Sequence, residues 1–360
     1  MAELYIGVMS GTSLDGVDIS LCEIDSKECK LLYANEYPFP LDLKTDILQM
    51  ISEASTIEQV GILDSKLGKL FGDLINKFLQ EFEINSDNIV AIGLHGQTLW
   101  HAPQNQHPFS IQLGSPSQVH SLTSIKVVSD FRNLDITNGG QGAPFAPAFH
   151  EFLFSAIKEK TTVVNIGGMA NVTLLGSTLQ GWDTGPGNIF LDTWIQKTKN
   201  FMYDKDGMFS KSGTLHQELL AIFLSDSYFK QKPPKSTGRE YFNSKWLEKN
   251  LQSFKMLPSE DIQRTLLELT AKTITDALKT TDTTLTILCG GGSKNGYLVQ
   301  RIQELSSHKV VNSKEYNVDS NAMESMAFAW FAYKRIHNEA ANLASVTGAK
   351  KNSILGGVYG

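Results

Sequence analysis

The sequence predicts an α/β protein made of two duplicated lobes around a central cleft. Its 360 residues exceed what one hydrophobic core usually organises. Expected strands and helices alternate along the whole chain, which is typical of α/β layers. Each half also opens with a strand, a glycine-containing turn and a second strand. We therefore expect an N-terminal lobe over residues 1–135 and a C-terminal lobe over 136–360, whose last residues could pack back on the N-terminal lobe.

The first half follows this order closely. Short apolar runs at 4–9 and 17–24 predict strands on either side of the turn at 10–16. Apolar residues at 60, 63, 67, 70, 74 and 78 have helical spacing. Further strands are expected over 89–94, 110–113 and 125–129, and Ser115-Pro116 is a typical helix start. The Gly- and Pro-rich stretch 132–147 is interpreted as the crossover between the halves.

The second half repeats the opening pattern. Strands are expected over 162–166 and 172–175, with the glycine turn 167–171 between them. The motif at 181–188 is followed by a helix from about residue 189. Amphipathic spacing predicts helices over 262–278, 297–305 and 321–335. A strand over 284–289 runs directly into Gly290-Gly291-Gly292.

Composition excludes several classes of protein. The formal net charge is −6, so no general positive field attracts nucleic acid or anionic lipid. The sparse cysteines Cys22, Cys29 and Cys289 favour a reducing compartment. No apolar run reaches the ~18 residues of a spanning helix, and the first residues lack the basic start of a signal peptide. A cytoplasmic location is therefore expected. Motifs of P-loop ATPases, Rossmann dehydrogenases and α/β-hydrolases are missing from the sequence.

The glycine clusters suggest phosphate binding. A single glycine turn can simply close a hairpin, but the first one carries Ser10, Thr12, Ser13 and Asp15. Its pattern recurs at 165–173, and a third cluster lies at a strand end at 290–292. Small residues let main-chain N–H groups converge on phosphate oxygens. Mg²⁺ could be held through water by Asp15 or Asp18.

Seven motifs of the chain resemble those of a known family. MSGTSLDGVD, HGQT, DFRNLDITNGGQGAP, NIGGMANVT, GWDTGPGN, KSTGRE and CGGGSKNG occur in this order, as in anhydro-N-acetylmuramic acid kinases. The resemblance covers residues 5–357. It implies the bilobal, RNase H-like fold of the acetate and sugar kinase, heat-shock-70 and actin superfamily. It also implies ATP-dependent conversion of 1,6-anhydro-N-acetylmuramic acid to N-acetylmuramic acid 6-phosphate during cell-wall recycling.

The resemblance also implies roles for individual residues. Asp183 matches the family's catalytic aspartate. The residues implied for ATP are Gly11, Thr12, Ser13, Leu14, Asp15, Gly16, Val17, Asp18, Asn165, Gly167, Gly168, Asn171, Gly290, Gly291 and Gly292. Those implied for the sugar are Ser10, His95, Gln97, Arg132 and Glu324. The segment 235–239 either contacts ligand or only orders a surface loop. ATP, Mg²⁺ and the small sugar are the expected partners, without nucleic acid or membrane, and a homodimer is implied.

The expected substrate restricts the chemistry. In a 1,6-anhydro sugar, O6 is bonded to C1 and has no proton for a base to remove. Water must therefore attack C1 while the departing O6 takes the γ-phosphoryl group, and Asp183 is expected to activate this water, as the base of an inverting glycosidase does. Arg132 suits the lactyl carboxylate of the sugar.

Alternatives stay open for these residues and for the function. Asp183 could simply cap the turn before the following helix, and Arg132 could form a surface ion pair. Glu324 could be buried with a partner, and His95 could form a hydrogen bond within its own turn. The nearest rival function is a kinase of another anhydro sugar, such as levoglucosan. A rival from another class is a nucleotide-dependent switch, either a sugar sensor or a chaperone-like ATPase.

Overall fold

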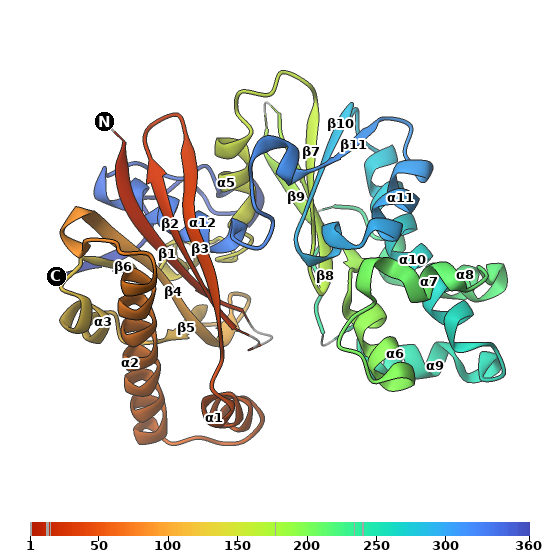
Figure 1. Ribbon diagram of the computed structural model, residues 1–360, viewed down its shortest axis with the longest axis horizontal. Helices are drawn as coiled ribbons and strands as arrows, with labels where there is room; N and C mark the ends of the chain where they lie inside the picture. The colour runs from red at the N-terminus through yellow and green to blue at the C-terminus, as the bar shows by residue number, and fades with distance from the viewer. Residues whose placement is uncertain (1, 12–13, 15, 177, 234, 240) are drawn as a thin grey trace. The chain divides into compact units, whose positions relative to one another are not determined.

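The chain forms two compact units, which are described separately (Figure 1). The computed structural model describes residues 2–11, 14, 16–176, 178–233, 235–239 and 241–360. The first unit comprises Met1–Phe154 and Ala322–Gly360, and the second comprises Ser155–Asn321.

A mixed sheet forms the centre of the first unit. Its strand order is β12-β6-β4-β1-β2-β3, with β5 paired to β4. The strands are β1 (Glu3–Ser10), β2 (Gly16–Ile24), β3 (Cys29–Pro38), β4 (Ile89–Ala102), β5 (Phe109–Leu113), β6 (Val127–Ser129) and β12 (Gly357–Tyr359). β1, β2 and β3 pair antiparallel, whereas β1 and β4, and β4 and β6, pair parallel.

Helices cover both faces of this sheet. They are α1 (Leu41–Ser52), α2 (Ile57–Glu81), α3 (Pro116–Thr123), α4 (Asn133–Thr137), α5 (Ala146–Leu153), α12 (Met323–Ile336) and α13 (Ala344–Thr347), with the 3₁₀ turn η1 (Ser86–Asn88). Because side chains alternate along a strand, Ile6 and Val8 of β1 join the core that contains the buried face of α2. On the other face α12 contacts β1 through Gly7, where a Cβ would lie 1.8 Å from the carbonyl oxygen of Ser325. This close contact fixes the first turn of α12, which carries Glu324.

The division of the chain differs from the expected boundary between residues 135 and 136. The predicted crossover contains α4 and the start of α5, and it belongs to the first unit. The buried Asp135 carboxylate accepts hydrogen bonds from Gly142 N (2.8 Å) and from Thr347 Oγ1 (2.8 Å). The ring of Phe149 also packs against Trp330 of α12. These contacts hold residues 136–154 in the first unit, although their composition is typical of a linker.

The second unit has its own mixed sheet in the order β11-β10-β7-β8-β9. Its strands are β7 (Thr161–Ile166), β8 (Met169–Leu174), β9 (Gln180–Pro186), β10 (Leu285–Cys289) and β11 (Lys309–Asn312). Its helices are α6 (Ile189–Lys199), α7 (Met208–Ser212), α8 (Gln217–Leu224), α9 (Ser244–Asn250), α10 (Ser259–Lys279) and α11 (Gly296–Leu305). Its 3₁₀ turns are η2 (Lys205–Gly207), η3 (Ser227–Lys230), η4 (Gln252–Phe254), η5 (Gly291–Lys294) and η6 (Ser313–Tyr316).

The two sheets have the same construction. The paths β3-β2-β1-β4-β6 and β9-β8-β7-β10-β11 share one strand order. In each path the first three strands pair antiparallel and the remaining pairs are parallel. The predicted duplicated α/β fold is therefore confirmed. The helices expected over 60–78 and 262–278 are confirmed as α2 and α10.

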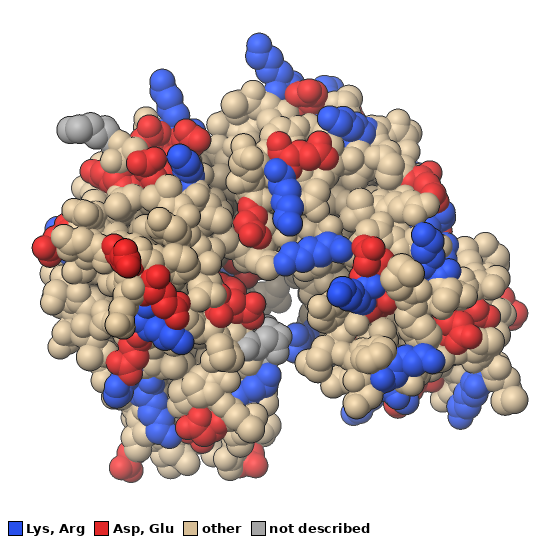
Figure 2. Space-filling view, viewed as in Figure 1, with Lys and Arg blue, Asp and Glu red and all other residues tan. Residues whose placement is uncertain are grey.

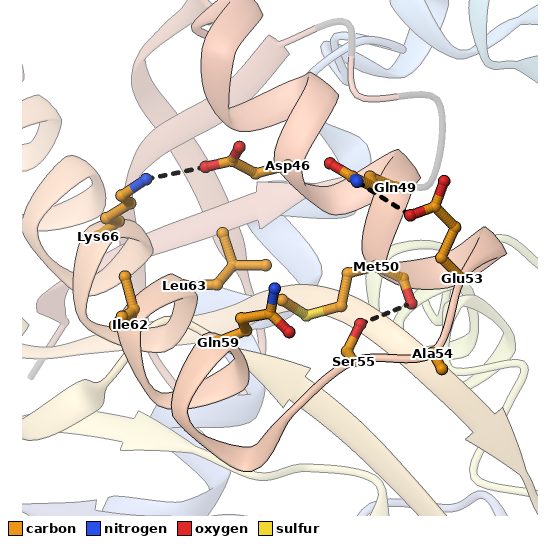
Figure 3. Close-up of a pocket in the computed structure, with 10 residues that line it drawn as sticks. All are labelled: Asp46, Gln49, Met50, Glu53, Ala54, Ser55, Gln59, Ile62, Leu63 and Lys66. Atoms are coloured by element: carbon orange, nitrogen blue, oxygen red, sulfur yellow. Dashed lines mark hydrogen bonds and ion pairs between the residues drawn. The ribbon is translucent and has the colours of Figure 1, made fainter.

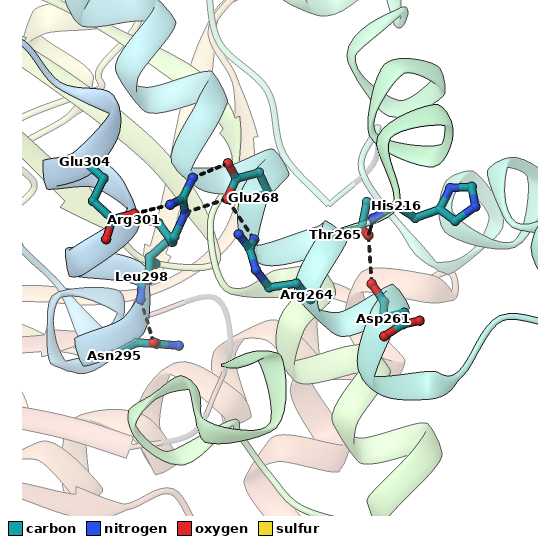
Figure 4. Close-up of polar contacts among 9 residues, drawn as sticks. All are labelled: His216, Asp261, Arg264, Thr265, Glu268, Asn295, Leu298, Arg301 and Glu304. Atoms are coloured by element: carbon teal, nitrogen blue, oxygen red, sulfur yellow. Dashed lines mark hydrogen bonds and ion pairs between the residues drawn. The ribbon is translucent and has the colours of Figure 1, made fainter. Parts of the chain in front are cut away.

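A buried carboxylate joins α10 to α11 in the second unit (Figure 4). Glu268 of α10 accepts a hydrogen bond from Arg264 Nη1 (2.7 Å) and two from Arg301 of α11, from Nε (2.9 Å) and Nη2 (2.8 Å). Burial raises the pKa of Glu268 and the two guanidinium groups lower it, with the guanidinium groups prevailing. Because α11 directly follows the turn η5, this network fixes the position of the third glycine cluster.

The surface carries mixed charge. On the face drawn in Figure 2, Lys and Arg side chains are interspersed with Asp and Glu, as the small net charge predicts. Among the described residues, no helix combines the length and the apolar character that crossing a bilayer requires.

Candidate functional site

A buried pair of polar side chains lies at the base of the first glycine hairpin, where β1 ends. Ser10 ends β1 and lies opposite Gln97 of β4. Ser10 Oγ donates to Gln97 Oε1 at 2.6 Å, and Gln97 Nε2 lies 3.4 Å from Gly11 O. The expected strand over 89–94 extends to Ala102, so His95 and Gln97 lie inside β4 instead of following it.

Few side chains of this hairpin are available to a ligand in the part of the chain that the structure describes. Leu14 and Val17 are buried in the core of the first unit, so they could contact ATP only through their main chain. Gly16 packs closely against the Glu36 side chain, since a Cβ at Gly16 would lie only 2.6 Å from Glu36 Oε1. Thr12, Ser13 and Asp15 lie outside the described residues.

The half-buried Arg132 contacts the buried His95 in the first unit. Arg132 Nη2 and Nε lie 2.8 and 3.2 Å from His95 Nε2, and Arg132 Nη1 donates to Gly142 O at 2.6 Å. Burial and the Arg132 charge lower the pKa of His95 well below its usual value. His95 is therefore a neutral acceptor, and both partners of the guanidinium are uncharged. A half-buried cation whose hydrogen-bond partners are uncharged is suited to an anionic ligand.

One carboxylate, that of Glu324, interacts electrostatically with Arg132, and it also interacts with Asp18. Glu324 is exposed to solvent, but desolvation by nearby protein atoms raises its pKa, and the charge of Arg132 lowers it in part. Burial lowers the pKa of Arg132 to about 10, against the opposite effect of Glu324, so Arg132 stays charged at neutral pH. Burial, together with the charges of Glu36 and Glu324, raises the pKa of Asp18 to about 7. Glu36 is a member of this group that the sequence did not indicate.

The second unit aligns its predicted residues in one row across the sheet. Cys289 pairs with Asn165, Asn165 with Asn171, and Asn171 with Asp183. Residues directly opposite one another in adjacent strands point to the same face. Asp183 lies inside β9, and not in the turn before α6 that the alternative of a turn cap required. This pairing brings the carboxylate beside the asparagines of the second hairpin.

Three glycine-containing segments meet at the end of this row. Asn188 N donates to Gly167 O at 2.8 Å, and Asn188 Nδ2 donates to Ile166 O at 3.3 Å. Gly290 has φ +77°, and a Cβ there would lie 2.4 Å from Asn165 Oδ1. A Cβ at Gly292 would lie 2.3 Å from Ile166 Cγ2. The predicted residues 165–168 and 290–292 therefore lie together. Asn188 was not among them, although the GWDTGPGN motif contains it.

The segment 235–239 contacts Asp183. Asp183 N donates to Lys235 O at 3.1 Å, and Asp183 Oδ2 accepts from Thr237 N at 2.8 Å. Tyr228 Oη donates to the carbonyl oxygen of Asp183 at 2.8 Å. Asp183 therefore has its amide, its carbonyl and one carboxylate oxygen held by neighbouring residues.

A hollow between α1 and α2 is lined by residues such as Met50 and Leu63, with the Asp46–Lys66 ion pair (2.8 Å) at its rim (Figure 3). None of the described residues lining it is a predicted site residue. Within the described chain, no three His, Cys, Asp or Glu side chains cluster as a metal site would require.

Two α/β units of matching strand order, each with a glycine hairpin beside polar side chains, define the actin-like class that includes the sugar kinases. Component A of (R)-2-hydroxyglutaryl-CoA dehydratase from Acidaminococcus fermentans shares this fold, with a TM-score of 0.50 at 13% identity over 93% of this chain and 99% of that one. Residues 3–360 match the family described as anhydro-N-acetylmuramic acid kinase. The anhydro-N-acetylmuramic acid kinase of Sulfurimonas denitrificans is 52% identical over the full length of both chains, and that of a Sulfurovum species is 52% identical over 99% of both. The chain belongs to this kinase family.

Proposed function

We propose that this protein uses ATP and water to convert 1,6-anhydro-N-acetylmuramic acid into N-acetylmuramic acid 6-phosphate and ADP, in recycling of the bacterial cell wall. Membership of the kinase family supports the reaction. The observation that carries the assignment of residues is the row Asn165–Asn171–Asp183, in which a carboxylate adjoins the second glycine hairpin.

The proposed reaction makes and breaks two bonds. A water oxygen bonds to C1 while the C1–O6 bond breaks, and O6 bonds to the γ-phosphorus while the bond from that phosphorus to the ADP oxygen breaks. Asp183 accepts the proton that the attacking water loses. No acid is needed at O6 because the phosphoryl group captures the departing oxygen. The phosphoryl transfer itself requires alignment and charge neutralisation.

The remaining predicted residues are assigned to the two substrates. We assign ATP to the glycine hairpins at 11–18 and 165–171 and to Gly290–292, whose main-chain N–H groups suit phosphate oxygens. We assign the sugar to Ser10, His95, Gln97, Arg132 and Glu324. Arg132 is proposed to bind the lactyl carboxylate, since its partners His95 and Gly142 O are uncharged. Levoglucosan has no carboxylate, so this contact favours the muramic acid derivative.

Mg²⁺ is expected to accompany ATP. Asp18 fits a role near the metal, because burial and the charges of Glu36 and Glu324 disfavour its ionised form and a divalent cation would favour it. When bound, Mg²⁺ supplies neutralisation of phosphate charge. Asp15 or Asp18 would hold it through water. Turnover of Asp15→Asn and Asp18→Asn over a range of Mg²⁺ concentrations tests this assignment.

The test of function is incubation with ATP, Mg²⁺ and 1,6-anhydro-N-acetylmuramic acid, followed by mass analysis. We expect a product heavier than the sugar by one phosphoryl group (HPO₃) and one water, with one ADP per product. Hydrolysis of ATP without a phosphorylated sugar would contradict the proposal and favour a nucleotide-dependent switch. Faster turnover of levoglucosan would favour the rival sugar kinase. A homodimer is proposed from family resemblance alone, and light scattering after size-exclusion chromatography tests it.

A further inference from the structure

The edge strand of the second sheet has an unusual partner. β9 ends the strand order β11-β10-β7-β8-β9, and the segment that contains Lys235 and Thr237 runs beside it at Asp183. Lys235 O accepts from Asp183 N at 3.1 Å, and Thr237 N donates to Asp183 Oδ2 at 2.8 Å. One short segment thus holds both the main chain and the carboxylate of the same residue.

Tyr228 fixes the Lys235 side chain close to this contact. Lys235 Nζ donates to Tyr228 O at 3.2 Å and lies 4.5 Å from the centre of the Tyr228 ring. The Tyr228 hydroxyl donates to Asp183 O at 2.8 Å. The ammonium group and the carboxylate interact electrostatically: burial lowers the pKa of Lys235, and the Asp183 charge raises it. Lys235 therefore lies in a fixed place within the field of Asp183.

We propose that Lys235 and Thr237 are positioning residues for the proposed base Asp183: the Thr237 amide orients the carboxylate, and the Lys235 ammonium keeps it ionised. This inference rests on the proposed function of Asp183. A cation near a carboxylate favours its charged form, and a base must be both ionised and aligned to remove a proton. The role assigned to residues 235–237 is thus support of the base and not merely order in a surface loop.

Other charged groups near Lys235 define the controls. Lys230 and Asp276 line the same hollow as Lys235. Asp276 of α10 is paired with Lys272 and with Lys279. In the row across the sheet, the neighbour of Asp183 is the neutral Asn171. Lys230 carries the same charge as Lys235 in the same hollow, so Lys230→Met is the matched control.

The test compares Lys235→Met, Lys235→Arg and Lys230→Met in the full-length protein. For Lys235→Met we expect kcat at pH 7 to fall about 10- to 100-fold, because the segment loses its anchor on Tyr228 O and the Thr237 amide no longer aligns the carboxylate. The KM of this variant for ATP should change less than about threefold. Its acidic limb in the pH profile of kcat should move upward by about one unit, because without the ammonium the carboxylate protonates at higher pH. Lys235→Arg should restore most of the rate and the limb, and Lys230→Met should match the wild type.

Two outcomes separate this inference from the proposed function. If wild type is active and Asp183→Asn is inactive, while Lys235→Met keeps both the wild-type kcat and the wild-type acidic limb, the positioning role is wrong and the base assignment stands. If wild type does not turn over the sugar, the proposed function itself fails. Should Lys235→Met be poorly folded by thermal melting, Lys235→Gln replaces it. That variant removes the charge but keeps a hydrogen-bond donor for Tyr228 O, and it should move the acidic limb toward higher pH by about one unit; an unmoved limb would contradict the account.

Discussion

Asp183 lies directly opposite Asn171 across the β8–β9 ladder. Asn171 in turn lies opposite Asn165 of β7, so the side chains of all three residues lie on one face of the sheet. A residue of the phosphate hairpin and the proposed base are therefore fixed relative to each other by backbone pairing, which is more rigid than a loop.

This arrangement predicts a selective defect for Asp183→Asn. The amide keeps the shape of the side chain but cannot accept the proton of the attacking water. We expect kcat to fall about 10³-fold or more, while the affinity for ATP changes less than about threefold. Steady-state kinetics and calorimetric titration of a non-hydrolysable ATP analogue measure the two effects. A kcat within tenfold of wild type would remove Asp183 from the role of base.

Arg132 is predicted to select for sugars that carry a carboxylate. Arg132→Met should lower kcat/KM for 1,6-anhydro-N-acetylmuramic acid about 100-fold, because a charge-assisted contact is lost. The KM for ATP should change little. His95→Gln, which keeps an acceptor for the guanidinium, should lose less than His95→Leu. An equal loss with levoglucosan, which has no carboxylate, would show that Arg132 acts on the fold and not on the substrate.

The raised pKa of Asp18 predicts a pH-dependent stability. An aspartate in the unfolded chain titrates near ~4, whereas burial, Glu36 and Glu324 raise the pKa of Asp18 to about 7. The folded protein therefore binds the Asp18 proton more tightly than the unfolded chain does. The resulting stabilisation of the fold is complete below the pKa of the unfolded chain and is lost as the pH rises through 7. The free energy of unfolding of the wild type should therefore be lower at pH 8 than at pH 5. In Asp18→Asn this difference between the two pH values should be smaller by on the order of 2 kcal/mol. Urea unfolding at both pH values measures it, and an unchanged pH dependence would refute this explanation.

The Glu268 network predicts a large structural effect. Glu268→Ala leaves the Arg264 and Arg301 guanidinium groups without their buried partner and should lower the free energy of unfolding by about 3–5 kcal/mol. Glu304 contacts the same Arg301 from the surface, so Glu304→Ala should lower it by less than about 1 kcal/mol. Urea denaturation of both variants provides the comparison. Similar losses for the two would mean that the buried network does not hold α10 to α11.

Local pattern was sufficient to predict most strands and helices and the repeated hairpin, because alternation and helical spacing follow directly from burial. Local pattern was not sufficient where contacts between residues distant in the sequence determine the structure of a segment. The stretch 132–147 has the composition of a linker, yet Asp135 binds Thr347 Oγ1 far along the chain. Strand β4 continues through Gly96, which adopts φ +76°, so that glycine did not mark its end.

The site was predicted unevenly for the same reason. Motifs indicated which residues belong together, and Asn165, Gly290 and Gly292 do meet. No local signal revealed that Glu36 approaches Asp18, because the two lie on paired strands β2 and β3. Nor did a local signal reveal that Thr237 binds Asp183, since the contact joins an edge strand to a segment beyond η3. Both depend on tertiary pairing.

Attack of water at C1 is the central claim, and isotope labelling tests it most directly. The reaction is run in ¹⁸O-water with ATP, Mg²⁺ and 1,6-anhydro-N-acetylmuramic acid, and the product is fragmented in a mass spectrometer before its anomeric oxygen can exchange. The account predicts one ¹⁸O at C1 and none in the phosphate. Label in the phosphate, with an unlabelled C1 oxygen, would contradict it.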